Sequence, residues 1–141
     1  MIELDIDLLH KNTELYEREL LHSRGSGRTT VIIERLIGSM FVSPPMSSFA
    51  LIGHNFSHTV SLKHQVYERL RWYGEYPKMT HARNDLLMEN GTHLLFSTPD
   101  RVFNDLRGIR LVNYFIDDVS DFYNLNNHEE ILSYLQARCY Y

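Results

Sequence analysis

The stretch that decides the fold reads Ser23-Arg24-Gly25-Ser26-Gly27-Arg28-Thr29-Thr30. It follows residues 12–21, a short segment of good helix formers with N-cap candidates at its start. The two glycines break that helical pattern. From Arg28 to Phe41 apolar residues again recur at helical spacing, so the glycine-rich stretch leads directly into the N-terminus of a predicted helix.

This stretch has the residue types that a phosphate-binding loop needs. Small residues let backbone amides turn toward phosphate oxygens, and the helix N-terminus behind them favours negative charge. Arg28 supplies a cation for the terminal phosphates, and Thr29, backed by Thr30, supplies a hydroxyl for Mg²⁺. Against the general G-x-x-x-x-G-K-[ST] pattern, His22 replaces the first glycine and Arg28 replaces the lysine. A capped, glycine-rich helix entry without a ligand therefore stays open as an alternative.

The rest of the chain alternates helical segments with short, continuously apolar runs, which are typical of strands buried on both faces. Strands are predicted at 49–53, 85–89, 92–96 and 111–116, and helices at 28–41, 57–73 and 129–138. Asn90-Gly91 is a strong hairpin signal between the second and third of these strands. The pattern predicts one α/β domain over residues 1–141, with a mainly parallel sheet flanked by helices and one β-hairpin.

Three residue pairs, each with at least one polar side chain, lie at the ends of predicted strands. They are Gly53-His54, Ser97-Thr98 and Asp117-Asp118. In open α/β sheets ligands bind at the carboxyl ends of the strands, so we expect these pairs to gather at one edge. Tyr114 to Asp118 is an apolar strand that ends in acid, and a P-loop NTPase needs such an acid to hold its metal.

In this order, the motifs resemble the ATPase domain of the large terminases, which package DNA in tailed phages. The phosphate loop of that family typically reads Ser-Arg-x-x-Gly-Lys-Thr, and residues 23–29 follow it except at Arg28. The resemblance covers roughly residues 20–122. Its further landmarks are Phe49 to Asn55, Glu89 to Thr92, Leu106 to Gly108 and Tyr114 to Asp118.

The resemblance implies a P-loop NTPase-like fold that binds ATP and Mg²⁺. Arg28 would act as the phosphate-binding lysine of the family does, and Thr29 and Asp117 would hold Mg²⁺. Arg24 matches the arginine that these motors are thought to use as an internal arginine finger, and Asp118 stands where the family has its catalytic glutamate. The whole cofactor-binding set would be Ser23, Gly25, Ser26, Gly27, Arg28, Thr29 and Thr30.

The departures from the family predict weak or absent ATPase activity. Arg28 is bulkier than lysine and prefers bidentate contacts, and Asp118 is one methylene shorter than glutamate. The segment 123–141 leaves no room for the strands that follow the acidic strand, so we expect a truncated relative without the nuclease domain. No clear first strand precedes His22, and no adenine-binding glutamine is evident. The alternative is an inactive P-loop-fold binding module that regulates or inhibits a partner protein.

The charge is unevenly spread. The formal net charge of −4 argues against a general polyanion binder, yet basic residues gather between positions 63 and 83. They are Lys63, Arg69, Arg71, Lys78 and Arg83. This stripe predicts a weak, salt-sensitive contact with nucleic acid; a solvated helix face is the alternative. An oligomer, or a phage or host protein partner, also stays open.

Composition argues against other classes. The chain has no apolar run near the roughly 20 residues that span a bilayer, and its first residues are acidic, so we expect a cytoplasmic protein without membrane contact, in the host cytoplasm if a phage encodes it. No G-x-S-x-G motif supports a serine hydrolase, and Cys139 lies in a predicted helix. His54 and His58 could bind a metal on a helix, but ordinary polar residues between strand and helix are the simpler interpretation.

Overall fold

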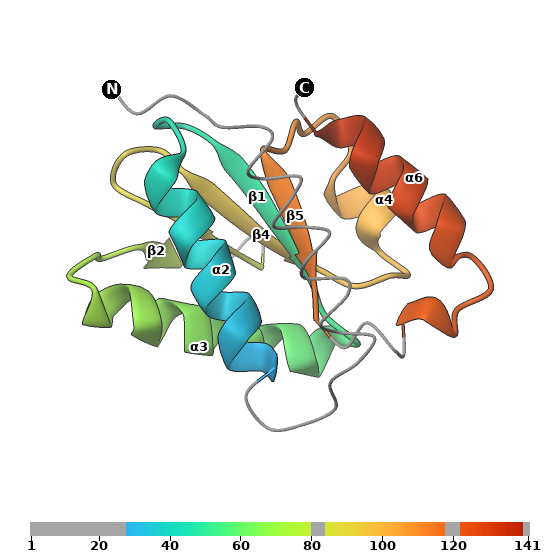
Figure 1. The fold of residues 1–141 in the computed structure, drawn as a ribbon, viewed down its shortest axis with the longest axis horizontal. Helices are drawn as coiled ribbons and strands as arrows, with labels where there is room; N and C mark the ends of the chain where they lie inside the picture. The colour runs from blue at the N-terminus through green and yellow to red at the C-terminus, as the bar shows by residue number, and fades with distance from the viewer. Residues whose placement is uncertain (1–27, 80–83, 118–121, 140–141) are drawn as a thin grey trace.

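A five-stranded mixed sheet lies at the centre of the computed structural model, which describes residues 28–79, 84–117 and 122–139 (Figure 1). The strand order is β2-β3-β4-β1-β5. The strands are β1 (Ser48–Ile52), β2 (Lys78–Met79), β3 (Asp85–Leu87), β4 (His93–Ser97) and β5 (Asn113–Ile116). β1 is parallel to both β4 and β5, whereas β3 is antiparallel to β2 and to β4. The α/β class is confirmed, but the sheet is mixed rather than mainly parallel, because β2 adds an antiparallel pair that the sequence did not predict.

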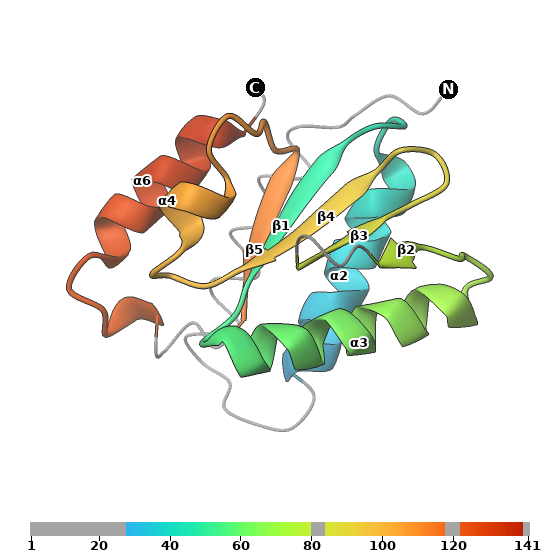
Figure 2. The same cartoon turned by 180° about the vertical axis from the view of Figure 1, so that it is seen from behind.

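Four helices flank the sheet in the described ranges. They are α2 (Arg28–Val42), α3 (Phe56–Trp72), α4 (Val102–Asp105) and α6 (His128–Arg138). α2 crosses in front of the sheet in Figure 1 and behind it in Figure 2, so it covers one face and packs against α3. α4 and α6 pack together beside β5, at the edge of the sheet (Figure 2). The predicted helices at 28–41, 57–73 and 129–138 are therefore confirmed to within a few residues. The helix predicted at 12–21 lies outside the described residues.

Local signals explain where two of these elements begin. Asn55 caps α3, because its Oδ1 accepts the backbone N–H of His58 at 2.9 Å. Gly91 has a φ of 87°, which favours glycine, and it lies in the turn that joins β3 to β4. The backbone N–H of Met88 donates to the Thr92 carbonyl at 2.8 Å across this turn. The hairpin predicted around Asn90-Gly91 is thus confirmed.

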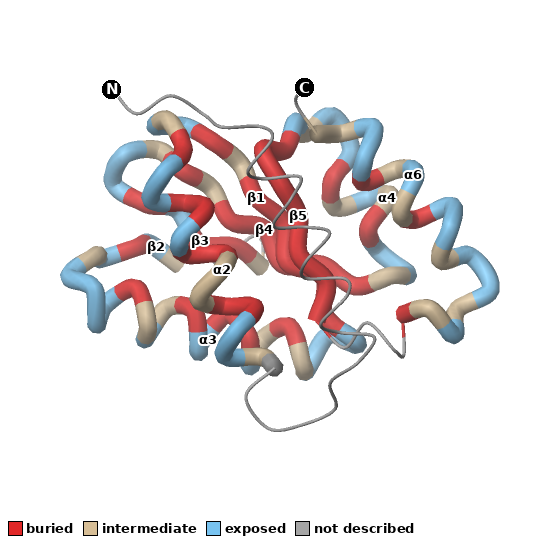
Figure 3. Tube along the Cα trace, viewed as in Figure 1, coloured by how far each residue is buried: buried red, intermediate tan, exposed pale blue. Residues whose placement is uncertain are grey.

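The core lies between the sheet and the inner faces of the helices. Figure 3 shows the sheet buried along its centre and the outer helical surfaces exposed. β1 is the most enclosed strand, with Phe49 to Ile52 wholly buried. Leu36 and Ile37 of α2 and Leu62 of α3 are also fully buried. No helix within the described ranges is long and apolar enough to cross a membrane.

Gly53→Ala should lower the free energy of unfolding by about 1–3 kcal/mol, because a Cβ at this position would lie 2.5 Å from Thr59 Cγ2. Gly53 follows β1 directly, so the clash would push the first turn of α3 away from the sheet. Gly38→Ala in α2 is the matched control, since its Cβ would meet nothing within 4 Å. Removing a glycine from a helix interior should raise stability by roughly 0.5–1 kcal/mol. Urea unfolding of both variants measures the change in the free energy of unfolding, which should fall for Gly53→Ala and rise for Gly38→Ala. Changes of the same sign would contradict the packing described for Gly53.

Candidate functional site

The carboxyl ends of the three parallel strands lie at one edge of the sheet. The backbone N–H of Gly53, after β1, donates to the Ser97 carbonyl of β4 at 2.9 Å. The backbone N–H of Asp117, after β5, donates to the Ile52 carbonyl of β1 at 2.9 Å. These bonds fix three strand ends side by side, as the sequence predicted for Gly53, Ser97 and Asp117.

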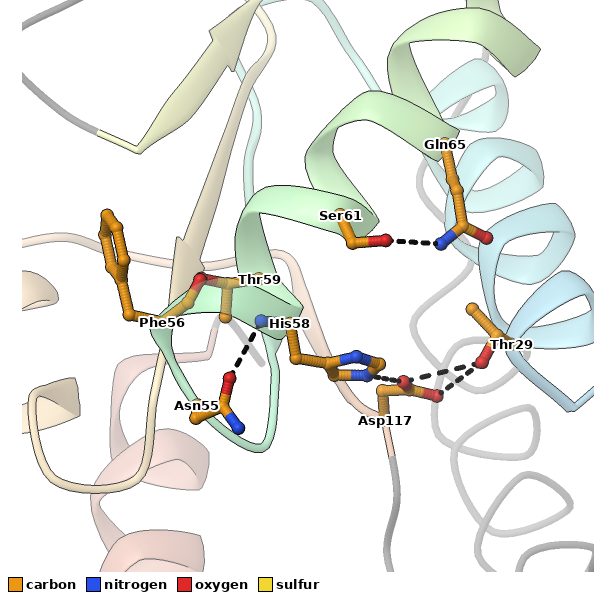
Figure 4. Close-up of polar contacts among 8 residues, drawn as sticks. All are labelled: Thr29, Asn55, Phe56, His58, Thr59, Ser61, Gln65 and Asp117. Carbon is orange, nitrogen blue, oxygen red and sulfur yellow. Dashed lines mark hydrogen bonds and ion pairs between the residues drawn. The ribbon is translucent and has the colours of Figure 1, made fainter.

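Asp117 presents a buried carboxylate at this edge, with a side chain only 4% exposed. The Thr29 hydroxyl donates to its Oδ1 at 3.3 Å and lies 3.5 Å from its Oδ2. Thr29 is the second residue of α2, and 88 positions separate the two residues in the chain. The fold therefore brings the predicted hydroxyl and the predicted acid into contact, with the N-terminus of α2 beside them (Figure 4).

His58 is the second partner of the same carboxylate. Its Nε2 lies 2.5 Å from Asp117 Oδ2, and because an ionised carboxylate only accepts hydrogen bonds, the imidazole N–H donates. Figure 4 shows the carboxylate between the His58 ring from α3 and the Thr29 hydroxyl from α2. A buried carboxylate needs such partners to offset its lost hydration. The two helices thus hold Asp117 in one position.

A cavity of about 250 Å³ adjoins Asp117 at the same edge. Gly53, His54, Asp100 and Asn127 are among the residues that line it. The cavity leaves space next to a fixed carboxylate and at the ends of parallel strands, which is where open α/β sheets bind ligands.

The remaining predicted site residues are only partly described. Arg28 is the first residue of α2, and Thr30 is exposed on the same turn. The other predicted site residues lie outside the described residues: Ser23, Arg24, Gly25, Ser26, Gly27 and Asp118. Their predicted roles in phosphate binding and catalysis are untested.

The contact between His58 and Asp117 was not predicted from the sequence. The sequence indicated His58 only as a potential metal ligand together with His54, four residues earlier. The available signal was the position of His58 in the first turn of a helix that follows β1, the strand beside the acidic strand. The first turn of such a helix lies at the carboxyl edge of the sheet, where Asp117 also lies.

The described residues of the predicted basic stripe lie in different surroundings. Lys63 is buried, and Arg69 pairs with Glu34 of α2 while stacking on the Trp72 ring at 4.2 Å. A hydrogen bond from Tyr73, together with Arg69, lowers the pKa of Glu34. Arg71 lies over the rings of Tyr67 and Tyr76, Lys78 is exposed in β2, and Arg83 lies outside the described residues. Lys63 therefore does not belong to a solvated face of α3, because it lies on the buried side of the helix, whereas Arg71 and Lys78 are exposed. Contact with nucleic acid stays a prediction.

Two observations concern metal ligands and reactive thiols in the described part of the chain. The described part of the chain holds no cluster of three or more His, Cys, Asp or Glu side chains that could enclose a metal ion. Burial raises the pKa of the Cys139 thiol to about 11, so this cysteine is a poor nucleophile at neutral pH.

The chain matches no family model, and no curated protein or solved structure shows significant similarity to it. The proposals below therefore depend on the geometry of the site and on the sequence motifs.

Proposed function

We propose that this chain binds ATP with Mg²⁺ at the N-terminus of α2, as a P-loop NTPase-like domain similar to the terminase ATPases. The contact between Thr29 and Asp117 carries the proposal. In P-loop NTPases, a hydroxyl at the start of the helix after the phosphate loop and an acid at a strand end hold the same metal ion. The two residues that the motifs assign to those roles touch each other here, although 88 positions separate them.

The ligand types fit Mg²⁺, which prefers oxygen donors and keeps several positions for water and substrate phosphates. Thr29 would supply a hydroxyl oxygen and Asp117 a carboxylate oxygen. The bound ion would neutralise charge on the phosphates. Arg28 would add a cation there, and the backbone amides of residues 25–29 would surround the phosphate oxygens. Arg24 and Asp118 are proposed as the arginine finger and the water-aligning acid.

The second candidate is a P-loop-fold module that binds a partner protein without turnover, and it has an observation in its favour. His58 already contacts Asp117 Oδ2 at 2.5 Å, so a metal ion must share this carboxylate with the imidazole or displace it. Magnesium-dependent nucleotide binding without hydrolysis would favour this candidate. A role in DNA packaging, or in another nucleic-acid process of a phage, rests on the resemblance alone.

Calorimetric titration with a non-hydrolysable ATP analogue tests the proposal. The wild-type chain should bind the analogue with Mg²⁺, and Thr29→Val should weaken binding tenfold or more, because it keeps the shape but removes the hydroxyl. One lost charge-assisted contact is worth about 1.5–3 kcal/mol. Thr29→Ser keeps the hydroxyl and should retain affinity. The control is Ser61→Ala, which removes an exposed hydroxyl on α3 that accepts a hydrogen bond from Gln65 at 3.2 Å.

Two outcomes would refute the nucleotide site. One is the absence of saturable binding at millimolar analogue with Mg²⁺. The other is equal binding by Thr29→Val and Thr29→Ser, which would leave the hydroxyl without a role. In the absence of Mg²⁺, the difference between these variants should shrink, because the hydroxyl acts through the ion.

A further inference from the structure

A second, larger cavity lies on the other side of the first turn of α3. Its volume is about 550 Å³, within the usual range for ligand pockets, and it opens between α3, the end of β4 and α4. Phe56, Lys63, Asn84, Arg101 and Asp105 are among its lining residues. Figure 4 shows Phe56 and His58 pointing in opposite directions from α3, so this cavity is separate from the site at Asp117.

Lys63 is the most informative residue of this cavity. Its residue surface is 9% exposed, and its ammonium group has no hydrogen-bonding or ionic partner within residues 28–79, 84–117 and 122–139. Most of the side chain is therefore buried, and a lysine of this kind can lie along apolar surface and bring its ammonium group to the cavity that it lines. An anion in the cavity would supply that partner.

The neighbouring charged groups leave the cavity electropositive. Arg101 also lines it, whereas Asp105, the one acid among the described lining residues, already accepts from Ser97 Oγ at 2.8 Å and lies 3.8 Å from Arg101 Nη2. Lys63 and Arg101 against Asp105 give a formal charge of +1, in a chain whose formal net charge is −4. His64, exposed on α3, is the other titratable side chain of the lining within the described ranges.

An aromatic ring and two amides complete the lining. The residue surface of Phe56 is 61% exposed, which is unusual for a phenylalanine and leaves the ring free to stack. Stacking of a base on such a ring is worth about 1–3 kcal/mol. Asn84 is held in place by donating to Thr59 Oγ1 at 3.0 Å, and Asn104 lies on α4. Amide side chains can donate to and accept from the edge of a base.

We propose that this cavity binds one nucleotide unit, with its phosphate at Lys63 and Arg101 and its base against Phe56. The unit is either a free nucleotide or a nucleotide splayed out from a single strand, because both carry the same phosphate and the same aromatic base. A duplex does not fit, since its bases are stacked inside the helix. The site does not require Mg²⁺ or the phosphate loop.

The test uses the full chain carrying Thr29→Val, in EDTA, so that the site at Asp117 does not contribute. Binding of dTMP is measured by calorimetry. Binding of a fluorescein-labelled dT12 oligonucleotide is measured by fluorescence anisotropy. At least one probe should bind saturably, and Lys63→Met should weaken that binding tenfold or more. Phe56→Ala should also weaken it, whereas Lys63→Arg should retain most of the affinity. Arg107→Met, at an exposed arginine that is not among the lining residues, should change it less than twofold.

Thermal unfolding separates a binding role from a structural role. Lys63→Met keeps the apolar stem of the buried side chain and removes only its charge, so the melting temperature should stay nearly the same while binding is lost. Equal binding by dTMP and dT12 would identify the free nucleotide, and tighter binding by dT12 would identify the strand. The proposal is overturned if neither probe binds, or if Lys63→Met and Arg107→Met bind alike. Neither of these results depends on ATP binding at Thr29.

Discussion

Phe49→Ala should remove about 3–5 kcal/mol from the free energy of unfolding. Phe49 is fully buried in β1, the strand that pairs with both β4 and β5. The truncation would leave a cavity between the sheet and its helices that the neighbouring strands cannot close without losing their register. Since domains of this size are stable by only about 5–15 kcal/mol, the variant should be close to unfolding at physiological temperature.

Urea denaturation followed by circular dichroism measures this loss. Phe56→Ala is the matched control, because it removes the same ring from a site that is 61% exposed, and we expect a change within about 0.5 kcal/mol. Similar losses in the two variants would contradict the burial of β1 at the centre of the sheet. If the stability of Phe56→Ala is unchanged, a loss of ligand binding in this variant cannot be caused by unfolding.

The parts of the fold that the sequence predicted are those with strong local signals. The apolar run at 49–53 predicted β1 because a strand covered on both faces needs no polar positions. Asn90-Gly91 predicted the hairpin because few dipeptides accept its turn geometry. β2, by contrast, has only Lys78 and Met79, and it exists through its pairing with Leu86 and Leu87 of β3. A pairing of this kind leaves no periodic pattern in the sequence.

Only part of the candidate site, too, could be predicted from the sequence. The chemistry of a phosphate loop selected Thr29 and Asp117 from the sequence, although they are 88 positions apart. The contact between His58 and Asp117 depends on how α3 is placed against β5, which the spacing of apolar residues does not specify. The burial of Lys63 was missed for a related reason: charge runs indicate a solvated face, whereas the packing of α3 on β4 turns this lysine inward. Long side chains can lie along apolar surface and bring their charge to a cavity.

The purified chain should hydrolyse ATP at less than about one turnover per minute, well below the usual range of roughly 1–10³ per second. Fast phosphoryl transfer needs the metal, the attacking water and a cation on the transferring phosphate to be positioned together. His58 competes for the carboxylate that would hold the metal, since it lies 2.5 Å from Asp117 Oδ2. Asp118 must also align water with a side chain one methylene shorter than the glutamate of the terminases. A misplacement of about 1 Å can cost roughly 10²-fold in rate.

Steady-state phosphate release from ATP and Mg²⁺ measures this turnover. Asp117→Ala should abolish the residual activity, whereas Glu89→Ala, at an exposed acid of the β3–β4 turn, should leave it unchanged. Asp118→Glu restores the reach of the water-aligning carboxylate, so it should raise the rate about tenfold or more without tightening nucleotide binding. Several turnovers per second from the wild-type chain, lost in Asp117→Ala, would show that aspartate at position 118 suffices and that His58 does not impede the metal. Activity that survives Asp117→Ala would instead remove Asp117 from the mechanism and with it the proposed ATPase site.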